Sequence, residues 1–352
     1  MASKFLEKIE SSSSAIKKHF IEDDTPWIIG YSGGKDSSLV VKILLMSLAK
    51  LEERNTKKIH LIYCDTGVEI PVTRDHIFES IQSIESEAKG IGINLQAKIV
   101  RPTINNSFFV KLIGRGYPPP SNKFRWCTDR LRIDPVQSAL SEITEDRKST
   151  VLLGTRYNES SKRNHTLNKS ATTDPYIYSQ TGHKKTSLFC PIYNFTTDDV
   201  WEGLLTESTI KSINITSLSN LYRQISGECP IIKMPDSSPC SKGRFGCWTC
   251  TVISKDKATE NLIKNGHTEL KPLQIFRDWL LEIRNDQKYR CTFRRNGVQA
   301  PGPFRISARN EILKKLELAE SESGIPLINT DEKLEIIKLW EKDLSNSNYR
   351  ED

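Results

Sequence analysis

The feature that most constrains this chain is a glycine loop between two apolar segments. The apolar run at residues 27–31 predicts a buried strand, and the periodic segment from Leu39 to Leu51 predicts a helix. Between them, Gly33 and Gly34 can adopt the dihedral angles of a tight turn and let a ligand approach the backbone. Backbone N–H groups at a helix start form an anion site. The sequence therefore predicts a strand–loop–helix unit that binds phosphate.

The side chains of this loop indicate a nucleotide together with a divalent metal. Hydroxyl groups and the Lys35 cation can bind phosphate oxygens, whereas Asp36 beside phosphates is best explained by a bridging cation such as Mg²⁺. An ordinary turn before a helix with an acidic first turn is the structural alternative. A Walker A loop is excluded because Gly-Lys-Ser/Thr is missing. The candidate nucleotide-binding residues of the loop are Ser32, Gly33, Gly34, Lys35, Asp36, Ser37 and Ser38.

Further apolar runs predict an α/β fold with a doubly wound, mainly parallel sheet. Predicted strands at 59–64 and 95–100 flank a predicted helix at 72–89, which gives a βαβαβ order. A strand at 150–154 and an edge strand from Leu188 to Ile192 follow, separated by a polar segment, 164–184, expected to be a mobile loop or lid. We expect this sheet domain to span residues 1–215. A smaller, cysteine-rich and mainly helical region is expected at 216–352.

Polar residues follow two of the predicted strands, where parallel sheets bind their ligands. Asp65 and Thr66 follow the strand at 59–64, and Arg156 follows the strand at 150–154. Asp65 could orient a nucleotide or metal, or only cap a helix. Arg156 could bind a phosphate through two parallel hydrogen bonds. These residues complete the predicted nucleotide site.

Composition limits the compartment and the partners. The chain has 352 residues, is 37% hydrophobic, and contains no apolar run near the ~18 residues of a membrane helix. Its first residues lack the apolar core of a signal peptide, so we expect a cytoplasmic protein without membrane association. Eight cysteines in that compartment favour metal binding or catalysis over disulfides. A net charge of +7 permits a polyanionic partner.

Four cysteines lie in one stretch rich in glycine and proline, and the last two form a Cys-x-x-Cys pair. Four thiols at such spacing can converge on a metal. The irregular spacing and adjacent prolines favour an iron–sulfur cluster, while a zinc site or a redox thiol pair are the alternatives. These candidate ligands are Cys229, Cys240, Cys247 and Cys250.

A fifth cysteine, Cys127, lies among basic residues. Cations lower the pKa of a thiol and favour the reactive thiolate, so Cys127 is a candidate nucleophile or an additional metal ligand. A buried, inert cysteine is the alternative. Basic and aromatic residues also alternate at 289–305, where they could follow a nucleic-acid backbone or form an ordinary solvated surface. The basic neighbours of Cys127 are Lys123, Arg125, Arg130 and Arg132.

Taken together, these motifs resemble the DndC family of bacterial DNA phosphorothioation, which belongs to the PAPS reductase-like, PP-loop N-type ATP pyrophosphatases. The resemblance runs from about residue 25 to residue 305. The SspD component of single-strand phosphorothioation has a similar core, and these motifs do not separate the two subtypes. The residues that carry the resemblance are 31–37, Asp65-Thr66, 112–118, 123–127, 153–156, Glu159-Ser160, 227–230 and 244–250.

The resemblance implies an adenine nucleotide alpha hydrolase-like fold and a defined chemistry. ATP with Mg²⁺ would bind the glycine loop, a nonbridging DNA phosphate oxygen would be adenylated, and sulfur would then displace AMP. The implied partners are DNA, a cysteine desulfurase as sulfur donor, and other phosphorothioation proteins of the DndD, DndE or SspB type. It also implies a 4Fe–4S cluster on Cys229, Cys240, Cys247 and Cys250. The residues expected to act in catalysis are Lys35, Asp36, Cys127 and Arg156.

Three other functions share parts of this pattern. A PAPS reductase usually carries a nucleophilic cysteine near its C-terminus, and residues 345–352 contain none. A tRNA-thiolating PP-loop enzyme would share the ATP site and the cluster, but the Phe-Arg-Trp-Cys motif at 124–127 argues against it. A non-catalytic nucleic-acid-binding subunit would use ATP only as a switch. Formation of AMP and pyrophosphate would distinguish an adenylating enzyme from such a switch.

Overall fold

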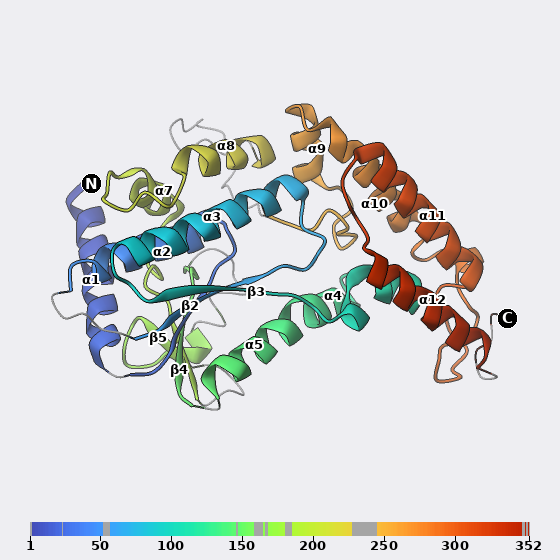
Figure 1. Ribbon diagram of the computed structural model, residues 1–352, viewed down its shortest axis with the longest axis horizontal. Helices are drawn as coiled ribbons and strands as arrows, with labels where there is room; N and C mark the ends of the chain where they lie inside the picture. Colours follow the sequence, from blue (N-terminus) through green and yellow to red (C-terminus); the bar gives the residue numbers. More distant parts are fainter. Residues whose placement is uncertain are drawn as a thin grey trace. The chain divides into compact units, whose positions relative to one another are not determined.

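The computed structural model divides into two compact units, and each is assembled from separate stretches of the chain (Figure 1). The first contains Met1–Tyr63, Pro71–Val100 and Ser138–Phe245, and the second contains Cys64–Ile70, Arg101–Gln137 and Gly246–Asp352. These units do not follow the domains 1–215 and 216–352, which stay a prediction. The described residues are 2–22, 24–51, 57–145, 147–157, 165, 168–179, 185–226, 245–346, 349 and 351.

A six-stranded sheet organises the first unit, in the order β3-β2-β1-β4-β6-β5. Strand β1 pairs in parallel with β2 on one side and with β4 on the other, and β4 pairs in parallel with β6. This confirms the predicted doubly wound, mainly parallel fold. The strands are β1 (Trp27–Gly30), β2 (Ile59–Cys64), β3 (Leu95–Val100), β4 (Ser149–Leu152), β5 (Ile177–Ser179) and β6 (Thr186–Phe189).

The end of the sheet differs from the prediction of an edge strand at Leu188–Ile192. The observed strand is β6, which starts earlier and lies inside the sheet, because β5 pairs with it in antiparallel fashion and forms the edge. The segment 164–184, predicted as a mobile loop or lid, supplies β5. Residues 164, 166, 167 and 180–184 of that segment lie outside the described residues.

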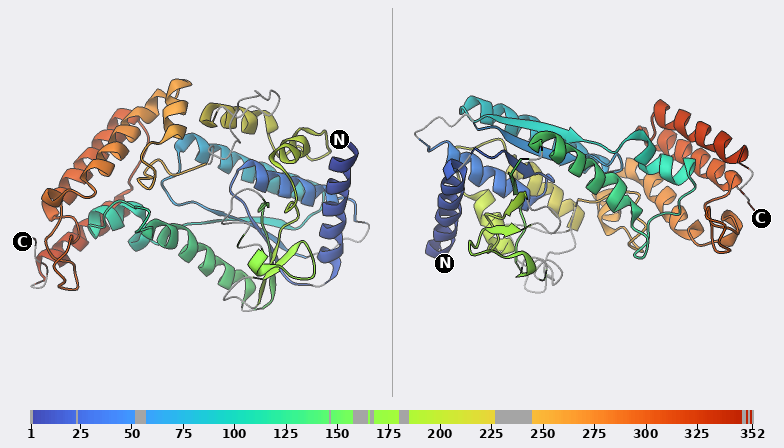
Figure 2. Two further views of the ribbon diagram at one scale, coloured as in Figure 1. Left: turned by 180° about the vertical axis from the view of Figure 1, so that it is seen from behind. Right: turned by 90° about the horizontal axis from the view of Figure 1, so that it is seen from below.

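Helices cover both faces of the sheet, as Figures 1 and 2 show, with α2 and α3 over one face and α5 over the other. The alternation along β2 explains this: Ile59 and Leu61 belong to the apolar core, whereas His60 points to the opposite face. The helices of this unit are α1 (Ala2–Glu22), α2 (Lys35–Leu48), α3 (Pro71–Gly90), α5 (Asp134–Thr144), α7 (Thr197–Leu205) and α8 (Ile215–Ser226); the first turn of α5 belongs to the second unit.

The second unit is mainly helical, as predicted for the C-terminal part. Helix α11 ends at Gly324, whose φ of 67° places it in the left-handed region, and Asn329 starts α12 with a capping box that includes Glu332. Its elements are η1 (Ile104–Asn106), the π-helix η2 (Val110–Gly114), α4 (Trp126–Thr128), the π-helix η3 (Asp129–Ile133), α9 (Lys257–Lys264), η4 (Thr268–Leu270), α10 (Lys271–Ile283), η5 (Gln287–Tyr289), α11 (Ile306–Ser323) and α12 (Thr330–Leu344).

Arginines serve as internal braces in the second unit. Arg309 is fully buried, and its guanidinium binds the Gly114 carbonyl at 3.1 Å and the Asp343 carboxylate at 2.7 Å. Arg295 also binds Asp343, through two hydrogen bonds of 2.7 Å. Arg290 donates to the backbone carbonyls of residues 284, 301 and 302. Within the basic stretch 289–305, Arg290 and Arg295 therefore brace the fold, and the contact of this stretch with a nucleic-acid backbone stays a prediction.

Within the described ranges, none of the helices combines the length and apolar character that crossing a lipid bilayer would require.

Candidate functional site

The glycine loop lies at the topological switch point of the sheet. From β1 the chain moves outward through β2 to β3, and it then returns to place β4 on the other side of β1. The loops after β1 and β4 therefore leave the sheet side by side, at the carboxyl ends of two adjacent parallel strands. Ligands of doubly wound sheets bind in the crevice at this point. The topology thus brings the predicted loop, 32–38, next to the segment that contains Arg156.

The shape of the loop depends on Gly33. Its φ is 71°, in the region that residues with a Cβ rarely adopt, and a Cβ there would overlap the Ile77 side chain. Gly34 has extended backbone and precedes the first turn of α2. The backbone therefore turns sharply and enters the helix with its N–H groups directed outward from the start of α2.

Hydroxyl groups fix the loop from inside. The buried Ser37 hydroxyl donates to the Gly34 carbonyl at 3.0 Å and accepts from the Ser32 backbone N–H at 3.3 Å. Ser37 and Ser32 Oγ atoms are also 3.1 Å apart, while Ser38 Oγ lies 3.4 Å from the Tyr31 hydroxyl. Ser32 is exposed, whereas Ser37 and Ser38 are buried. Ser32 is therefore the hydroxyl of the three that faces solvent and a ligand.

Asp36 and Arg156 form an ion pair across the switch point. Arg156 Nε lies 2.6 Å from Asp36 Oδ1, and a second guanidinium nitrogen donates to the Phe195 carbonyl at 3.2 Å. Arg156 is only 5% exposed, so its guanidinium is shielded from water, whereas Asp36 is half-buried. Gly154 permits this approach, because a Cβ there would lie 2.8 Å from the Asp36 carbonyl carbon. The structure brings both residues together; their roles in binding metal and phosphate stay predictions.

Tyr222, which the sequence did not single out, contacts the loop from helix α8. Its hydroxyl accepts a hydrogen bond from the Lys35 backbone N–H at 3.2 Å, and the Lys35 ammonium lies 4.6 Å from the centre of its ring. The apolar spacing of Leu218, Leu221 and Ile225 could have predicted helix α8. No local pattern could have shown that its tyrosine reaches the glycine loop, because the contact joins residues far apart in the chain.

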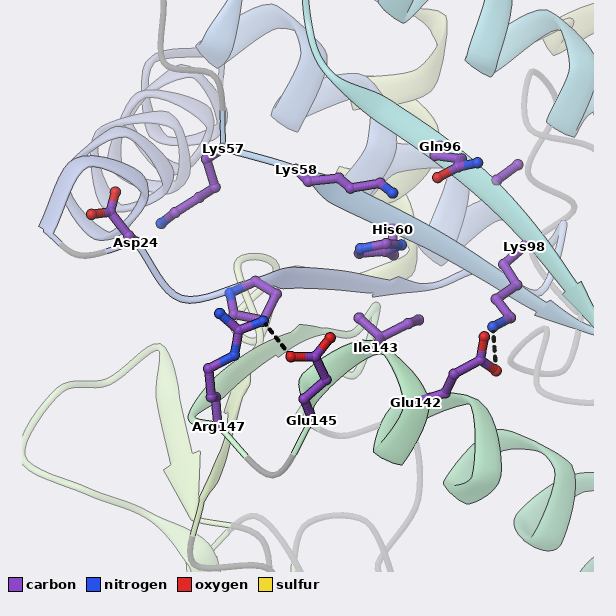
Figure 3. A pocket seen from close by; sticks show the side chains of 12 residues that line it. Asp24, Lys57, Lys58, His60, Gln96, Lys98, Glu142, Ile143, Glu145 and Arg147 are labelled. Carbon is purple, nitrogen blue, oxygen red and sulfur yellow. Dashed lines mark hydrogen bonds and ion pairs between the residues drawn. The ribbon is translucent and has the colours of Figure 1, made fainter.

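A cavity of about 770 Å³ lies at the opposite end of the strands from the glycine loop, near the amino ends of β1, β2 and β4. Figure 3 shows that α5 and the strands face each other across it. Lys98 pairs with Glu142 at 2.7 Å, and Arg147 pairs with Glu145 at 3.3 Å. These paired charges and the position at the amino ends of the strands favour a structural role over a catalytic one.

In the second unit, the segment after β2 pairs with the Cys-x-x-Cys segment. Glu69 and Cys247 form an antiparallel bridge, with backbone hydrogen bonds from Ile70 to the Gly246 carbonyl (3.2 Å) and from Trp248 to the Val68 carbonyl (3.0 Å). Cys64, to which the sequence gave no role, belongs to the same neighbourhood, and its thiol donates to the Leu131 carbonyl at 3.1 Å. A local pattern could not have revealed this pairing.

Burial controls the ionisation of these thiols. It raises the pKa of Cys247 to about 11, although the Arg132 guanidinium lies 3.6 Å from its sulfur and lowers that pKa. Burial likewise raises the pKa of Cys64 to about 11. For Cys127, burial and then the neighbouring Cys250 thiol raise the pKa. The net pKa shift of Cys127 is therefore opposite to the expectation: Arg132 lowers the pKa, as expected for a basic neighbour, but burial outweighs it.

Neighbouring, half-buried thiols fit a metal centre in their chemistry. A bound cation removes the cost of ionising them, and coordinated thiols are deprotonated. All the described cysteines are free thiols, including Cys127, Cys247 and Cys250. In the described part of the chain, no three cysteine, histidine or carboxylate side chains form a group that could hold a metal ion. Cys229 and Cys240 lie outside the described residues, so the four-cysteine ligand set stays a prediction. Glu159, Ser160 and Arg244 also lie outside them.

Asp65 and Thr66 are held by local hydrogen bonds in the second unit. Asp65 accepts from Arg101 Nε at 2.8 Å and from the Gly67 backbone N–H at 3.0 Å. The Thr66 hydroxyl donates to Glu69 at 2.6 Å. Asp65 and Thr66 also line a mostly apolar cavity of about 380 Å³. Their part in nucleotide binding stays a prediction.

Comparisons with known proteins place the chain in a family. The sequence model of the phosphoadenosine phosphosulfate reductase domain matches residues 26–253. Uncharacterized protein MJ0066 of Methanocaldococcus jannaschii is 28% identical over 192 residues, which are 54% of this chain. The alignment spans only 34% of that relative's length.

Solved structures are similar only at a distance. PAPS reductase from Candida auris has a TM-score of 0.35 at 16% identity, with 55% of this chain and 78% of that chain covered. The U34-tRNA thiolase NcsA from Methanococcus maripaludis, solved with its 4Fe–4S cluster, has a TM-score of 0.39 at 15% identity, with 80% of each chain covered. Candida glabrata FMN adenylyltransferase, with FMN and an ATP analogue, has a TM-score of 0.40 at 13% identity, with 88% and 82% covered.

The family match covers well over half of the chain and includes both the glycine loop and the Cys-x-x-Cys pair. The chain therefore belongs to the phosphoadenosine phosphosulfate reductase domain family.

Proposed function

We propose that the protein is the ATP pyrophosphatase and sulfurtransferase component of a cytoplasmic DNA phosphorothioation system. The observation that carries the ATP chemistry is the switch-point geometry, which brings the start of α2, Lys35 and the Asp36–Arg156 pair together beyond the carboxyl ends of β1 and β4. The choice of DNA as acceptor rests on the motifs at 112–118, 123–127 and 244–250, which resemble those of the DndC family.

The first step is adenylation of the acceptor. A nonbridging oxygen of the DNA phosphate attacks the α-phosphorus of ATP, the bond between that phosphorus and the α–β bridging oxygen breaks, and pyrophosphate leaves. The N-terminus of α2 and Lys35 would bind the departing phosphates. Arg156 would stabilise the charge that develops on them, and Asp36 would hold a Mg²⁺ ion that neutralises phosphate charge.

The second step replaces oxygen by sulfur. The terminal sulfur of a persulfide, supplied by a cysteine desulfurase, attacks the activated DNA phosphorus, and AMP leaves with the former nonbridging oxygen. A second thiol then attacks the inner sulfur of the persulfide. This breaks the S–S bond, releases the phosphorothioate and leaves a disulfide. Cys127 is the proposed thiol of this chain that carries or releases sulfur, and Arg132 would stabilise its thiolate against the effect of burial.

The cysteine cluster would hold iron and sulfide. Cys229, Cys240, Cys247 and Cys250 are the proposed ligands of a 4Fe–4S cluster, and Cys127 could replace one of them. When bound, the cluster would stabilise the fold of the cysteine region and could supply sulfur or electrons. In this chain, Arg132 beside Cys247 would stabilise a thiolate at that position.

A direct experiment supplies ATP, Mg²⁺, a persulfide donor and one acceptor at a time to protein purified without oxygen. We expect AMP and pyrophosphate in equal amounts, and a phosphorothioate dinucleotide after nuclease digestion of DNA, detected by mass spectrometry. Sulfite formed from PAPS would instead support a reductase. Thiolated nucleosides from tRNA would support a tRNA thiolase, and ADP without pyrophosphate would support an ATP-dependent switch.

A further inference from the structure

An exposed aromatic ring is held rigidly in the loop before α4. Phe124 is 46% exposed, although aromatic residues of this size are usually buried. Ser121 and Phe124 form an antiparallel bridge with two backbone hydrogen bonds of 3.1 Å, and the Phe124 N–H also lies 3.2 Å from the Ser121 hydroxyl. The ring is therefore presented to solvent on a tight, hydrogen-bonded turn.

Buried aromatic residues support this turn from below. Trp126 is buried, donates its indole N–H to the Pro118 carbonyl at 2.9 Å and stacks on Phe108 with ring centres 5.4 Å apart. Tyr117 bridges Trp126 and Phe124, at 5.6 Å and 6.2 Å between ring centres. A preorganised support reduces the entropy lost when a ligand stacks on the exposed ring.

Cations gather beside the same rings. The Lys111 ammonium lies 5.6 Å from the centre of the Tyr117 ring, and Arg115 and Arg130 are close enough to lower the pKa of Lys111, after the larger effect of burial. Lys123 and Arg125 flank Phe124 in sequence and are exposed. Of the carboxylates at 111–134, Asp134 pairs with Arg130 at 2.9 Å. The cations therefore exceed the carboxylates, and a bound anion would relieve their mutual repulsion.

We propose that this basic–aromatic surface binds single-stranded DNA, with an unpaired base stacked on Phe124 and phosphates held by the surrounding cations. The surface is defined as Lys111, Arg115, Lys123, Phe124, Arg125 and Arg130. Stacking on an aromatic side chain combined with phosphate contacts is the common mode of single-strand binding. A duplex hides the faces of its bases, so it could use the cations but not the ring. The assignment of the nucleic acid as DNA rests on the proposed function.

The position of the surface also matters for the reaction. Cys127 lies three residues after Phe124, in the short helix α4 that also contains Trp126. A strand stacked on Phe124 would place a neighbouring phosphate near the thiol that we propose to handle sulfur. In the stretch 289–305, which could follow a nucleic-acid backbone or form an ordinary solvated surface, Arg290 and Arg295 make internal hydrogen bonds. The structure therefore favours 111–130 over 289–305 as the DNA contact.

The first test measures fluorescence anisotropy of a labelled oligo-dT strand and of a hairpin duplex of equal length. Removing one stacking contact weakens single-strand binding by roughly 5- to 150-fold. We expect this loss for Phe124→Leu, which keeps apolar area but not the ring, with duplex binding unchanged. Phe124→Trp should bind the strand as tightly as the natural protein. Ile275→Ala removes another exposed apolar side chain of the same unit and should change neither affinity.

The second test concerns the cations. The triple variant Lys123→Gln/Arg125→Gln/Arg130→Gln should weaken single-strand binding and reduce the slope of log affinity against log salt by about 2, since each lost phosphate contact contributes about 0.7. The variant Lys314→Gln/Lys338→Gln/Lys342→Gln removes the same charge from exposed positions on α11 and α12 and is the matched control. Equal losses in both triple variants would show an effect of net charge alone.

The proposal is overturned if Phe124→Leu and the loop triple variant bind the single strand as the natural protein does. We would expect that result if the partner of this surface were an anionic protein and the surface did not contact DNA. The outcome is separable from the proposed function. If the variants lose binding and no phosphorothioate forms with any protein, the surface stands and the phosphorothioation proposal fails. If phosphorothioate forms equally in all variants, the phosphorothioation proposal stands and the proposed DNA-binding surface fails.

Discussion

At the scale of single residues, the glycine loop depends on Gly33, where both the left-handed backbone conformation and the lack of space beside Ile77 disfavour a side chain. We expect Gly33→Ala to reduce pyrophosphate formation and ATP affinity by at least about tenfold. The left-handed backbone alone costs alanine about 1 kcal/mol, and the overlap with Ile77 adds to it. Pyrophosphate release and ATP binding by calorimetry would measure the change.

Gly92 offers a matched control for this prediction. Its φ is 79°, close to that of Gly33, but a Cβ there would meet nothing within 4 Å. Gly92→Ala should therefore show the small backbone cost without loss of ATP binding. An equal loss of ATP affinity in both variants would mean that a general loss of stability, and not a change in the glycine loop, causes the effect.

A second residue-scale prediction concerns Asp343, which neutralises two arginines in the second unit. Burial would raise its pKa, but hydrogen bonds from Arg295 and Arg309 outweigh this and hold the pKa below its usual 3.8. Removing one partner of a buried ion pair costs about 3–5 kcal/mol, so Asp343→Asn should lower the free energy of unfolding by that order. Urea unfolding followed by circular dichroism at pH 7 would measure it.

The same pair predicts the pH dependence and its sign. A carboxyl whose folded pKa is depressed stabilises the fold fully above its unfolded pKa, and this contribution disappears as the pH falls through the folded pKa. The stability difference between the natural protein and Asp343→Asn should therefore be constant above about pH 5 and shrink below pH 3.8. Glu341→Gln, at an exposed position of the same helix, should show no such trend.

At the scale of elements, helix α8 acts on the glycine loop through Tyr222. Tyr222→Phe removes the hydroxyl that accepts the Lys35 N–H but keeps the ring under the ammonium. A buried hydrogen bond contributes about 1 kcal/mol, so ATP affinity should fall by roughly fivefold. Tyr176→Phe, which removes a hydroxyl 2.6 Å from Ser11, should leave ATP affinity unchanged. A Tyr222→Phe protein with full affinity would contradict a role for α8 in ordering the loop.

The elements that the sequence predicted well are those whose apolar pattern and turn residues lie within one short stretch of the chain. Strand β1 and most of helix α2 are apolar, and the glycines between them mark the turn, so strand, loop and helix were predicted in the right order, although α2 begins and ends earlier than predicted. The order of β1, β2 and β3 followed from the alternation of strands and helices. The doubly wound sheet could thus be derived before any contact was known.

Other features depend on partners that are remote in sequence. Strand β5 has three residues and exists because it pairs with β6, which no local pattern indicates. The basic residues around Cys127 suggested a depressed pKa, but burial of the thiol by remote segments reverses the direction. Likewise, the Asp36–Arg156 ion pair could be predicted only once the topology of the sheet was known, although both residues had been selected as site residues.

At the scale of the whole molecule, the metal content of the purified protein tests the cluster that we propose for the cysteine region. Protein purified without oxygen should contain about four iron and four sulfide ions per chain, with a brown colour, as expected for a 4Fe–4S cluster. Cys247→Ser should lose the colour and most of the iron. Cys190→Ala removes a buried cysteine of the first unit and should retain both. One zinc ion per chain without iron would make the region structural.

The discontinuous makeup of the two units limits how this protein can change. Because the second unit combines Cys64–Ile70, Arg101–Gln137 and Gly246–Asp352, the chain passes back and forth between the units, and the segment at Glu69 closes onto Cys247. No single break in the gene separates one complete unit from the other. A C-terminal segment exchanged between relatives would carry only part of the second unit, so Cys64–Ile70 and Arg101–Gln137 would have to be exchanged with it.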